Sequence, residues 1–533
     1  MKLKIALFII LFHRFIFSCS AQQVPGITDF TSLSPLLQTG NLIIPPSHNF
    51  QWLTGTGDYY STGGGVVPDR NDFAGFIPIN GSSEHGFLCV NHETFPGAVG
   101  VYELIYDSSR YKWNILNSRK VNLNLPLGTA GNCSGHITPW KTMISCEELT
   151  TNTDLNFDGY EDYGWCFEVD PVTATVMEYG TGSSQKLWKL GCMAHENLVV
   201  AKDSIHVYYG EDGNTSCMYK FIADQPGNLF LGTMYSLKLD DPFNGGIPSG
   251  TTGTWVPIPN STKQECNDAN ITAYNLGCND FSGVEDVEIN PITGYIYFAS
   301  KNNGRVYRFQ DDGTTISNFE VIAGGTDYLI QTANGNEYVS WGSGNDNMAF
   351  DTTGNLWVYQ DGGNNYIWLL KNTHSPQNPQ VSIFGISPIG SEPTGVNLTP
   401  DNRFLFMSVQ HPSGSNGAQF DATGKRVSFN RSATIVIARE ELLHPLQKVI
   451  YGTPAITIYP NPAHQYFHLD DLPEISDGYE LYVYNSEGQL VKEEQGLYID
   501  EYSNIFLPEL NPGLYICRFR SGSATFNKKF VVN

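Results

Sequence analysis

Basic residues and long apolar runs are both scarce in this sequence of 533 residues. There are 30 Lys and Arg residues against 54 Asp and Glu residues, which gives a formal net charge of −24. Such a surface repels the phosphate backbone of nucleic acids and attracts divalent cations. No stretch of the sequence reaches the roughly 18 uninterrupted apolar residues that a membrane-spanning helix needs. We therefore expect neither a nucleic-acid partner nor a membrane span.

Common local motifs of catalysis are also missing from the chain. The sequence has no nucleophile elbow, no glycine-rich phosphate-binding loop and no paired-histidine zinc motif. Only 16% of the residues are charged, whereas Gly, Tyr and Phe are abundant and Asn/Asp/Gly clusters recur throughout. This composition is typical of turn-rich β structure, so we expect an all-β protein.

The N-terminus has the pattern of a secretory signal peptide. Two lysines precede an apolar stretch from Ile5 to Phe17, and small residues follow up to Ala21. This order of basic, apolar and small residues predicts cleavage after Ala21, so residues 1–21 are assigned to the signal peptide. A lipoprotein cleavage before Cys19 is the alternative that we favour less.

Nine of the ten cysteines follow the predicted signal peptide. An exported chain enters an oxidising compartment, where disulfides can form. Cys266 and Cys278 flank a short loop rich in Asn and Gly and are the first candidates for a disulfide, and Cys192 with Cys217 are the second. The odd number leaves at least one thiol unpaired.

A hairpin pattern repeats along the first 450 residues. In the copies that begin at Gly283, Asn345 and Glu392, an acidic residue lies at the start of a short strand, a polar turn follows, and an aromatic-aliphatic strand returns to a polar cluster. Looser copies begin at His136 and His195, and a returning strand of the same type begins at Gly86. About six hairpins result, which predicts a six-bladed β-propeller over residues 22–450.

The repeat places polar clusters at one end of the predicted ring. In an antiparallel hairpin, the start of the first strand and the end of the second lie at the same end. The residues so placed are Glu93, Cys146, Glu147, Glu148, Glu196, Glu211, Asp212, Glu285, Asp286, Asp346, Asp361 and Glu392. Carboxylates that crowd together disfavour their own ionisation unless cations neutralise them, so we expect a metal site.

The ligand types bear on which metal ions would bind. An all-oxygen group suits calcium, whereas a thiolate at Cys146 beside Glu147 suits a softer ion such as iron or zinc. Two other interpretations remain open. Each acid taken alone can be an ordinary solvated turn residue, and Cys146 can belong to a disulfide, which the odd cysteine count permits but does not require.

Several segments resemble the PhoX-type alkaline phosphatases over residues 50–420 or so. They occur in the order seen in that family, and the most specific is Thr138–Glu148; the others are Val90–Glu93, Ala194–Glu196, Val207–Asp212, Val284–Pro291, Asp346–Asp351 and Val409–Pro412. The resemblance implies a six-bladed propeller with iron and calcium ions on its axis that hydrolyses phosphate monoesters outside the cytoplasm.

The resemblance also implies roles for individual residues. Cys146 becomes an iron ligand, and Glu196, Glu285 and Asp346 become carboxylate ligands of the iron and calcium ions. Glu147, Glu148 and Glu93 are further candidate ligands, matched less closely. Metal-assisted phosphoryl transfer of this kind needs no amino-acid nucleophile.

One departure from the family concerns substrate binding. Members commonly carry an Arg-Pro pair before the acid that corresponds to Glu285, but Gly283 and Val284 occupy those places here. Lys301 or Arg305 in the same repeat could take over the contact with phosphate, although a Lys is not equivalent to a bidentate Arg.

The tail of the chain, residues 451–533, is predicted to be a separate small β-sandwich. Short alternating strands are separated by Asn, Gly and Pro turns. The entry Tyr459–Pro462 and the strand around Pro512–Tyr515 resemble the C-terminal sorting domain of type IX secretion cargo. The implied partner of this domain is the secretion machinery, and we assign it no chemistry.

The leading hypothesis from the sequence is a secreted or cell-surface, monomeric, metal-dependent phosphatase that acts on small phosphate esters. The main alternative is a non-catalytic calcium-binding propeller that serves as a surface adhesion or ligand-binding module. Propellers host both functions, so the fold does not choose between them. A lactone hydrolase on a calcium-binding propeller is a third possibility, which shares the acidic axis but should not need the cysteine.

Overall fold

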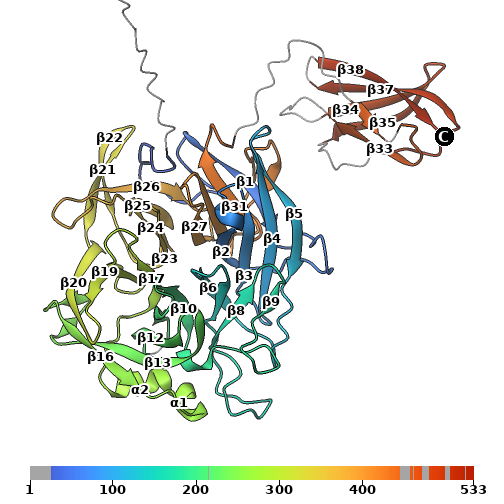
Figure 1. Cartoon of the computed structure of the whole chain (residues 1–533). Helices are drawn as coiled ribbons and strands as arrows, with labels where there is room; N and C mark the ends of the chain where they lie inside the picture. The colour runs from blue at the N-terminus through green and yellow to red at the C-terminus, as the bar shows by residue number, and fades with distance from the viewer. Residues whose placement is uncertain are drawn as a thin grey trace, which may run out of the picture.

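A computed structural model describes residues 26–213, 215–443, 457–459, 461–470, 479–497, 505–521 and 524–533. The fold is nearly all-β, as the composition predicts, with two short helices (Figure 1). The predicted signal peptide lies outside the described residues.

The body of the protein consists of antiparallel sheets joined by short turns (Figure 1). The first sheet contains β2 (Asn71–Pro78), β3 (His85–His92), β4 (Ala98–Asp107) and β5 (Lys112–Lys120). The second contains β6 (Asn132–Ile137), β7 (Met143–Glu147), β8 (Cys166–Asp170) and β9 (Thr175–Val176).

The third sheet is longer, because β16 pairs with β20 and so joins two groups of strands. Its strands are β10 (His195–Val200), β11 (His206–Glu211), β12 (Met218–Gln225), β13 (Asn228–Leu239), β16 (Gly253–Ile258), β17 (Val284–Ile289), β18 (Ile296–Ser300), β19 (Arg305–Asp311) and β20 (Thr315–Gly324). The helices α1 (Lys263–Asn267) and α2 (Ala269–Asn275) lie between β16 and β17 in the chain, and Thr262 caps α1.

Two further sheets complete the body. One contains β23 (Asn345–Phe350), β24 (Leu356–Gln360), β25 (Tyr366–Leu370) and β26 (Val381–Ile386). The other contains β1 (His48–Gly55), β31 (Ala433–Arg439), β28 (Phe404–Gln410) and β27 (Glu392–Leu398). Three short ribbons add β14 (Phe243–Asn244), β15 (Ile247–Pro248), β21 (Asp327–Thr332), β22 (Gly335–Ser340), β29 (Ala418–Phe420) and β30 (Arg426–Ser428).

The inner strands surround a common axis. Each contacts the next in the order β2, β6, β10, β17, β23 and β27, and β27 contacts β2 again. The sheets therefore radiate from this axis in a propeller-like ring (Figure 1).

Pairing between two distant parts of the chain closes the ring. Strand β1 pairs with β31 from His48 opposite Arg439 to Gly55 opposite Ala433, so the last sheet takes one strand from the beginning of the chain. Strand β1 covers the edge of β31 and becomes the outermost strand of this sheet.

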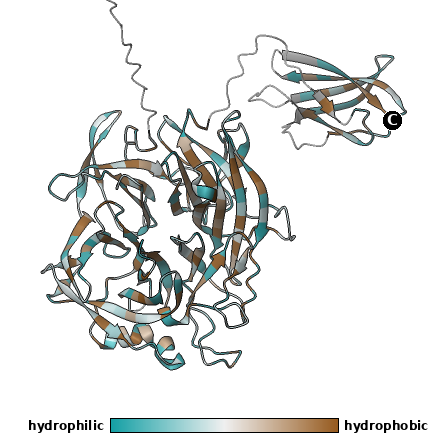
Figure 2. Cartoon of the chain, viewed as in Figure 1, coloured by the Kyte–Doolittle hydropathy of each residue, from teal (hydrophilic) through white to brown (hydrophobic). Residues whose placement is uncertain are grey.

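The space between neighbouring sheets is filled by large apolar side chains. Phe76 of β2 stacks on Phe406 of β28 with ring centroids 5.0 Å apart, and the edge of Trp113 lies against both. Hydrophobic and hydrophilic residues alternate along many strands in Figure 2. Because alternate side chains point to opposite faces of a strand, this pattern packs one sheet against the next.

The described residues of the tail form a unit with its own core. One sheet contains β35 (Leu490–Leu497), β34 (Tyr479–Asn485), β37 (Gly513–Ser521) and β38 (Ala524–Val532), and another contains β32 (Thr457–Tyr459), β33 (Tyr466–Asp470) and β36 (Ile505–Phe506). Phe467, Leu481, Phe519 and Phe530 are buried together within it. None of the described helices is long and apolar enough to cross a bilayer.

Neither disulfide that the sequence favours is formed in the structure. Cys266 and Cys278 are separate buried thiols, and so are Cys192 and Cys217. The thiol of Cys192 donates to the carbonyl of Tyr163, and that of Cys266 donates to a different backbone carbonyl, so each of these thiols has a hydrogen-bond partner other than cysteine.

Gly395 is required where β27 packs against β2. Its φ is +60°, and a Cβ at this position would lie 2.5 Å from the backbone nitrogen of Ala74 and 2.5 Å from the carbonyl oxygen of Asp72. We predict that Gly395→Ala lowers the free energy of unfolding by about 2–3 kcal/mol, from backbone strain and from the clash together. Denaturant unfolding measures this change. Gly414→Ala is the control, because nothing lies within 4 Å of its Cβ, and equal stability of the two variants would contradict the prediction.

Candidate metal centre

A β-bulge interrupts the inner strands near their first residue. In β2, β6, β10, β17 and β23, the register breaks directly after the first paired residue. The first unpaired residues of these bulges are Asp72, Cys133, Glu196, Glu285 and Asp346. A bulge redirects side chains away from the regular pleat, so five potential metal ligands come from equivalent positions around the axis.

Ligand atoms from these strands lie close together in three overlapping groups. The groups are Cys133 with Glu148 and Glu196, Glu196 with Glu285 and Asp346, and Asp346 with Asp361 and Glu392. Within each group the ligand atoms lie within 4.8 Å of one another. We call these seven residues, together with Asp72, the axial group. Shared members make the three groups one continuous cluster.

The thiol of Cys133 makes short contacts with two carboxylates of the axial group. The Cys133 thiol donates to Oε1 of Glu196 at 2.9 Å and approaches Oδ2 of Asp72 at 3.4 Å. Gln410 also donates to this oxygen of Asp72. Cys133 therefore lies between two buried carboxylates.

A second set of polar residues follows the returning strand of each hairpin. Glu93, Glu148, Asp212, Lys301, Asp361 and His411 each come directly after such a strand. Lys301 is a cation within the acidic cluster, with its Nζ 3.4 Å from Glu285, 3.6 Å from Asp346 and 3.6 Å from Asp361. Burial alone would lower the pKa of Lys301, but the charges of Asp346 and Glu285 raise it above the ordinary value.

Burial and mutual repulsion make the acids of the axial group reluctant to ionise. Burial, followed by the charges of Glu93 and Asp212, raises the pKa of Glu148 to about 7. Burial also raises the pKa of Asp346 to about 6. The pKa values of Glu196 and Glu285 are raised well above their usual range by the same two causes. Lys301 offsets only part of this repulsion.

The axial group fits metal cations. Oδ1 of Asp72 and Oε2 of Glu196 are buried and have no hydrogen-bond partner within the described part of the chain. A buried carboxylate oxygen without a partner is costly, and a bound cation would satisfy it. Oxygen-only groups suit calcium, and a group that contains the sulfur of Cys133 suits iron.

A cavity of about 270 Å³ lies on the axis beyond the bulges. Its lining includes the second bulge residues Asn197, Asp286 and Asn347, together with Glu288 and Phe350 further along the strands. Both carboxylate oxygens of Asp286 accept hydrogen bonds, one from the side chain of Asn197 and one from the backbone N–H of Met348. No member of the axial group lines this cavity.

Residues 112–413 match the family described as alkaline phosphatase PhoX. The match covers more than half of the chain and includes most of the residues that form the axial group. The chain belongs to the PhoX alkaline phosphatase family. Membership identifies it as a phosphatase with acidic residue groups able to bind metal ions.

Solved structures with the same fold include PhoX from Pseudomonas fluorescens in complex with vanadate, a transition state analogue. That structure is 20% identical, the match covers 78% of this chain and 98% of the PhoX chain, and the TM-score is 0.61. A periplasmic gluconolactonase from Pseudomonas aeruginosa is 12% identical over 74% and 99% of the two chains, with a TM-score of 0.38. No curated protein matches the chain.

Residues 457–533 match the C-terminal sorting domain of a secretion system. Such a domain directs export by the type IX route, so this PhoX phosphatase is secreted or held at the cell surface. The matched residues fall within residues 451–533, which the sequence predicts to be a separate unit.

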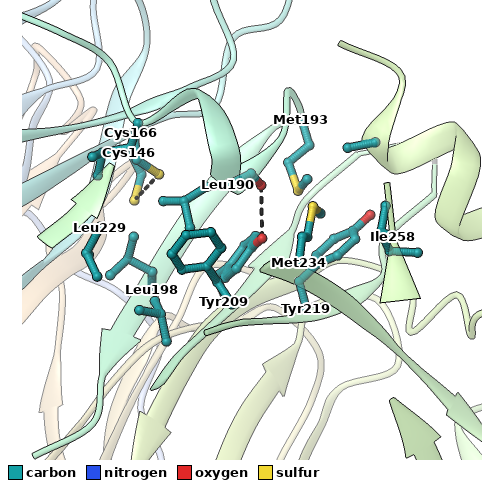
Figure 3. Packing of buried hydrophobic residues seen from close by; sticks show 14 of the residues in the cluster. Cys146, Cys166, Leu190, Met193, Leu198, Tyr209, Tyr219, Leu229, Met234 and Ile258 are labelled. Carbon is teal, nitrogen blue, oxygen red and sulfur yellow. Dashed lines mark hydrogen bonds between the residues drawn. The ribbon is translucent and has the colours of Figure 1, made fainter. Parts of the chain in front are cut away.

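The structure places two predicted PhoX metal ligands away from the axis. Glu147 forms a buried ion pair with Lys186 at 2.8 Å and accepts the backbone N–H groups of Gly164 and Trp165 at 3.0 Å each. Cys146 packs in an apolar cluster, where its sulfur lies 3.6 Å from that of Cys166 (Figure 3). Both residues lie on β7, one strand further from the axis than β6.

The remaining predicted residues lie within the axial group, at its edge or outside it. Glu196, Glu285, Asp346 and Glu148 lie in the axial group. Glu93 lies at its rim, 3.4 Å from Arg70 and 3.9 Å from His411. Lys301 reaches the acids, whereas the guanidinium of Arg305 bonds to the backbone carbonyls of Asn303 and Gly245 and so is held outside the group.

Sequence reasoning missed Asp72 and Cys133. A signal for both was present, because Asn71-Asp72 and Asn132-Cys133 repeat the pair Asn345-Asp346 at the start of an inner strand. Alignment of the repeats on this Asn would have chosen Cys133 over Cys146 as the axial sulfur.

The raised pKa values predict that the metal-free protein loses stability as the pH rises. The folded state holds protons on Glu148 and Asp346 up to about pH 6–7, whereas the unfolded chain releases them near pH 4. Stability is therefore greatest below pH 4 for this contribution and falls between about pH 4 and 7, by up to roughly 6 kcal/mol for the two groups together. Denaturant unfolding in chelator at pH 5 and pH 8 measures the difference, and Glu148→Gln should reduce it. Stability that rises over this range would contradict the prediction.

Proposed function

We propose that the axial group binds iron and calcium ions and hydrolyses phosphate esters outside the cell. The observation that carries this proposal is the overlap of one sulfur-containing group, around Cys133, with two oxygen-only groups through Glu196 and Asp346. When bound, such ions neutralise negative charge on phosphate and lower the barrier to phosphoryl transfer. No side chain of the chain is assigned as nucleophile.

The proposed ligands follow from the geometry. Cys133, Glu148 and Glu196 would hold iron, because the sulfur and two carboxylates lie within 4.8 Å of one another. Glu285, Asp346, Asp361 and Glu392 would hold calcium through oxygen atoms alone. Asp72 supports Cys133 from the other side.

Lys301 is the residue that we propose binds the substrate phosphate in place of the family Arg. Its side chain is 28% exposed and its ammonium lies 3.4 Å from Glu285, so it can reach both the axial group and the solvent. It would attract an anionic ester to a site whose surroundings are otherwise acidic and would hold one phosphate oxygen. His411 and Arg70 supply further donors at the rim around Glu93.

The architecture proposed for this function has three parts. Residues 1–21 form the signal peptide, residues 22–450 a six-bladed propeller, and residues 451–533 the sorting β-sandwich. The ring of six inner strands supports the blade count, with the long third sheet counted as two blades joined through β16 and β20. The protein would act as a monomer, because one chain supplies the whole axial group.

We predict that Cys133→Ser removes the bound iron and lowers phosphatase activity at least about 100-fold, since a hydroxyl is a poor substitute for a thiolate ligand. Elemental analysis of the exported protein and hydrolysis of an aryl phosphate at alkaline pH measure the two effects. Cys89→Ser is the matched control, because Cys89 is equally buried but packs between other side chains of its own sheet and the next. A wild-type protein that contains the metals yet hydrolyses no phosphate mono- or diester would leave only the non-catalytic calcium-binding function.

We predict that Lys301→Gln raises KM and lowers kcat/KM about 100-fold, because one charged contact with phosphate is lost. Metal content is measured on the same sample and should stay unchanged. Arg305→Gln is the control and should alter kcat/KM less than twofold, since its guanidinium bonds to backbone carbonyls outside the site. Equal losses in both variants would contradict the assignment of Lys301.

A further inference from the structure

Cys146, which lies away from the axis, is next to a second cysteine. Cys146 of β7 lies opposite Cys166 of β8, and their sulfur atoms are 3.6 Å apart. Within the described part of the chain, this is the one pair of cysteines whose thiols hydrogen bond to each other. Figure 3 shows the two side chains pointing toward one another.

The position of the pair in the sheet suits a covalent bond. The next pair along the ladder, Glu147 with Trp165, is joined by a backbone hydrogen bond of 3.0 Å. Because bonded and non-bonded pairs alternate in an antiparallel ladder, Cys146 and Cys166 form a non-hydrogen-bonded pair, with Cα atoms about 4.5 Å apart. Disulfides span Cα separations of about 4.4–6.8 Å, so the backbone already meets this requirement.

The surroundings also favour a bond between the two sulfurs. Both thiols are fully buried in an apolar cluster with Leu190 and Leu198 (Figure 3). Leu187 belongs to the same cluster. Neither belongs to any of the groups of ligand atoms found in the described residues. The exported protein meets an oxidising environment, in which an apposed pair of this kind is stable as a disulfide.

We propose that Cys146 and Cys166 form a cross-strand disulfide in the exported enzyme. The two thiols give up two protons and two electrons as the S–S bond forms. A protein disulfide of the thiol oxidoreductase class accepts them and becomes a dithiol. Because both sulfurs are fully buried in the finished fold, the bond forms while the hairpin is still open to the oxidant.

The disulfide would hold a segment that adjoins the metal site. It closes a loop over residues 147–165, which begins with Glu147 and Glu148. Glu147 fixes this loop through Lys186, and Glu148 belongs to the axial group. The covalent bond would therefore stabilise the position of Glu148, whether or not the ions proposed above are the ones bound.

Alkylation and mass spectrometry test the proposal on the full exported wild-type protein. The sample is unfolded without reductant, its thiols are blocked with N-ethylmaleimide, and it is digested. We expect peptides that contain Cys146 and Cys166 to be linked and to separate on reduction, while the other cysteines are alkylated at the first step. Alkylation of both residues before reduction would overturn the proposal.

Thermal unfolding provides a second measurement. We expect a thiol reductant to lower the unfolding midpoint of the wild-type protein by about 5 °C, as loss of a short-loop disulfide should. The double variant C146A/C166A should show no shift, whereas Cys89→Ala should keep the full shift. An iron content that falls in Cys146→Ala with both thiols reduced in the wild type would instead make Cys146 a ligand and end the proposal.

Discussion

Pairing of β1 with β31 is the constraint on which the rest of the structure depends. Two strands separated by nearly the whole propeller share one sheet, and this exchange holds the inner strands in a closed circle. Only in such a circle do bulges at equivalent positions of separate sheets face one another. The positions of the ligand side chains at the centre of the ring therefore depend on a backbone pairing that lies far from the axis.

The same geometry concentrates negative charge that the fold alone does not neutralise. Lys301 is the one cation in ion-pair contact with Glu285 and Asp346 among the described residues, and it leaves several buried carboxylate oxygens without partners. Burying charges without partners is costly, so the arrangement is unfavourable for stability and favourable for cation binding. Stability and function compete at this site, which is common where a protein must attract a ligand.

The sequence reveals the repeat and the acids more readily than the sulfur ligand. Glu196, Glu285 and Asp346 are found because each lies at the start of an inner strand, where the repeat is easy to align. The sulfur ligand is harder to identify, because Cys133 and Cys146 lie on the two neighbouring strands β6 and β7, and the bulge in β6 turns the side chain of Cys133 towards the axis. The Asn that precedes Cys133, as it does Asp72 and Asp346, is the signal for this position in the sequence. The contacts of Arg305 likewise depend on loops distant in sequence.

The register that closes the ring also determines where the chain enters and leaves it. His48 begins β1 directly opposite Arg439, which ends β31, so the first strand of the ring begins beside the point where its last strand ends. Because β1 and β31 are the two outermost strands of their sheet, both ends of this pairing lie at the periphery of the ring, remote from the acids at its centre.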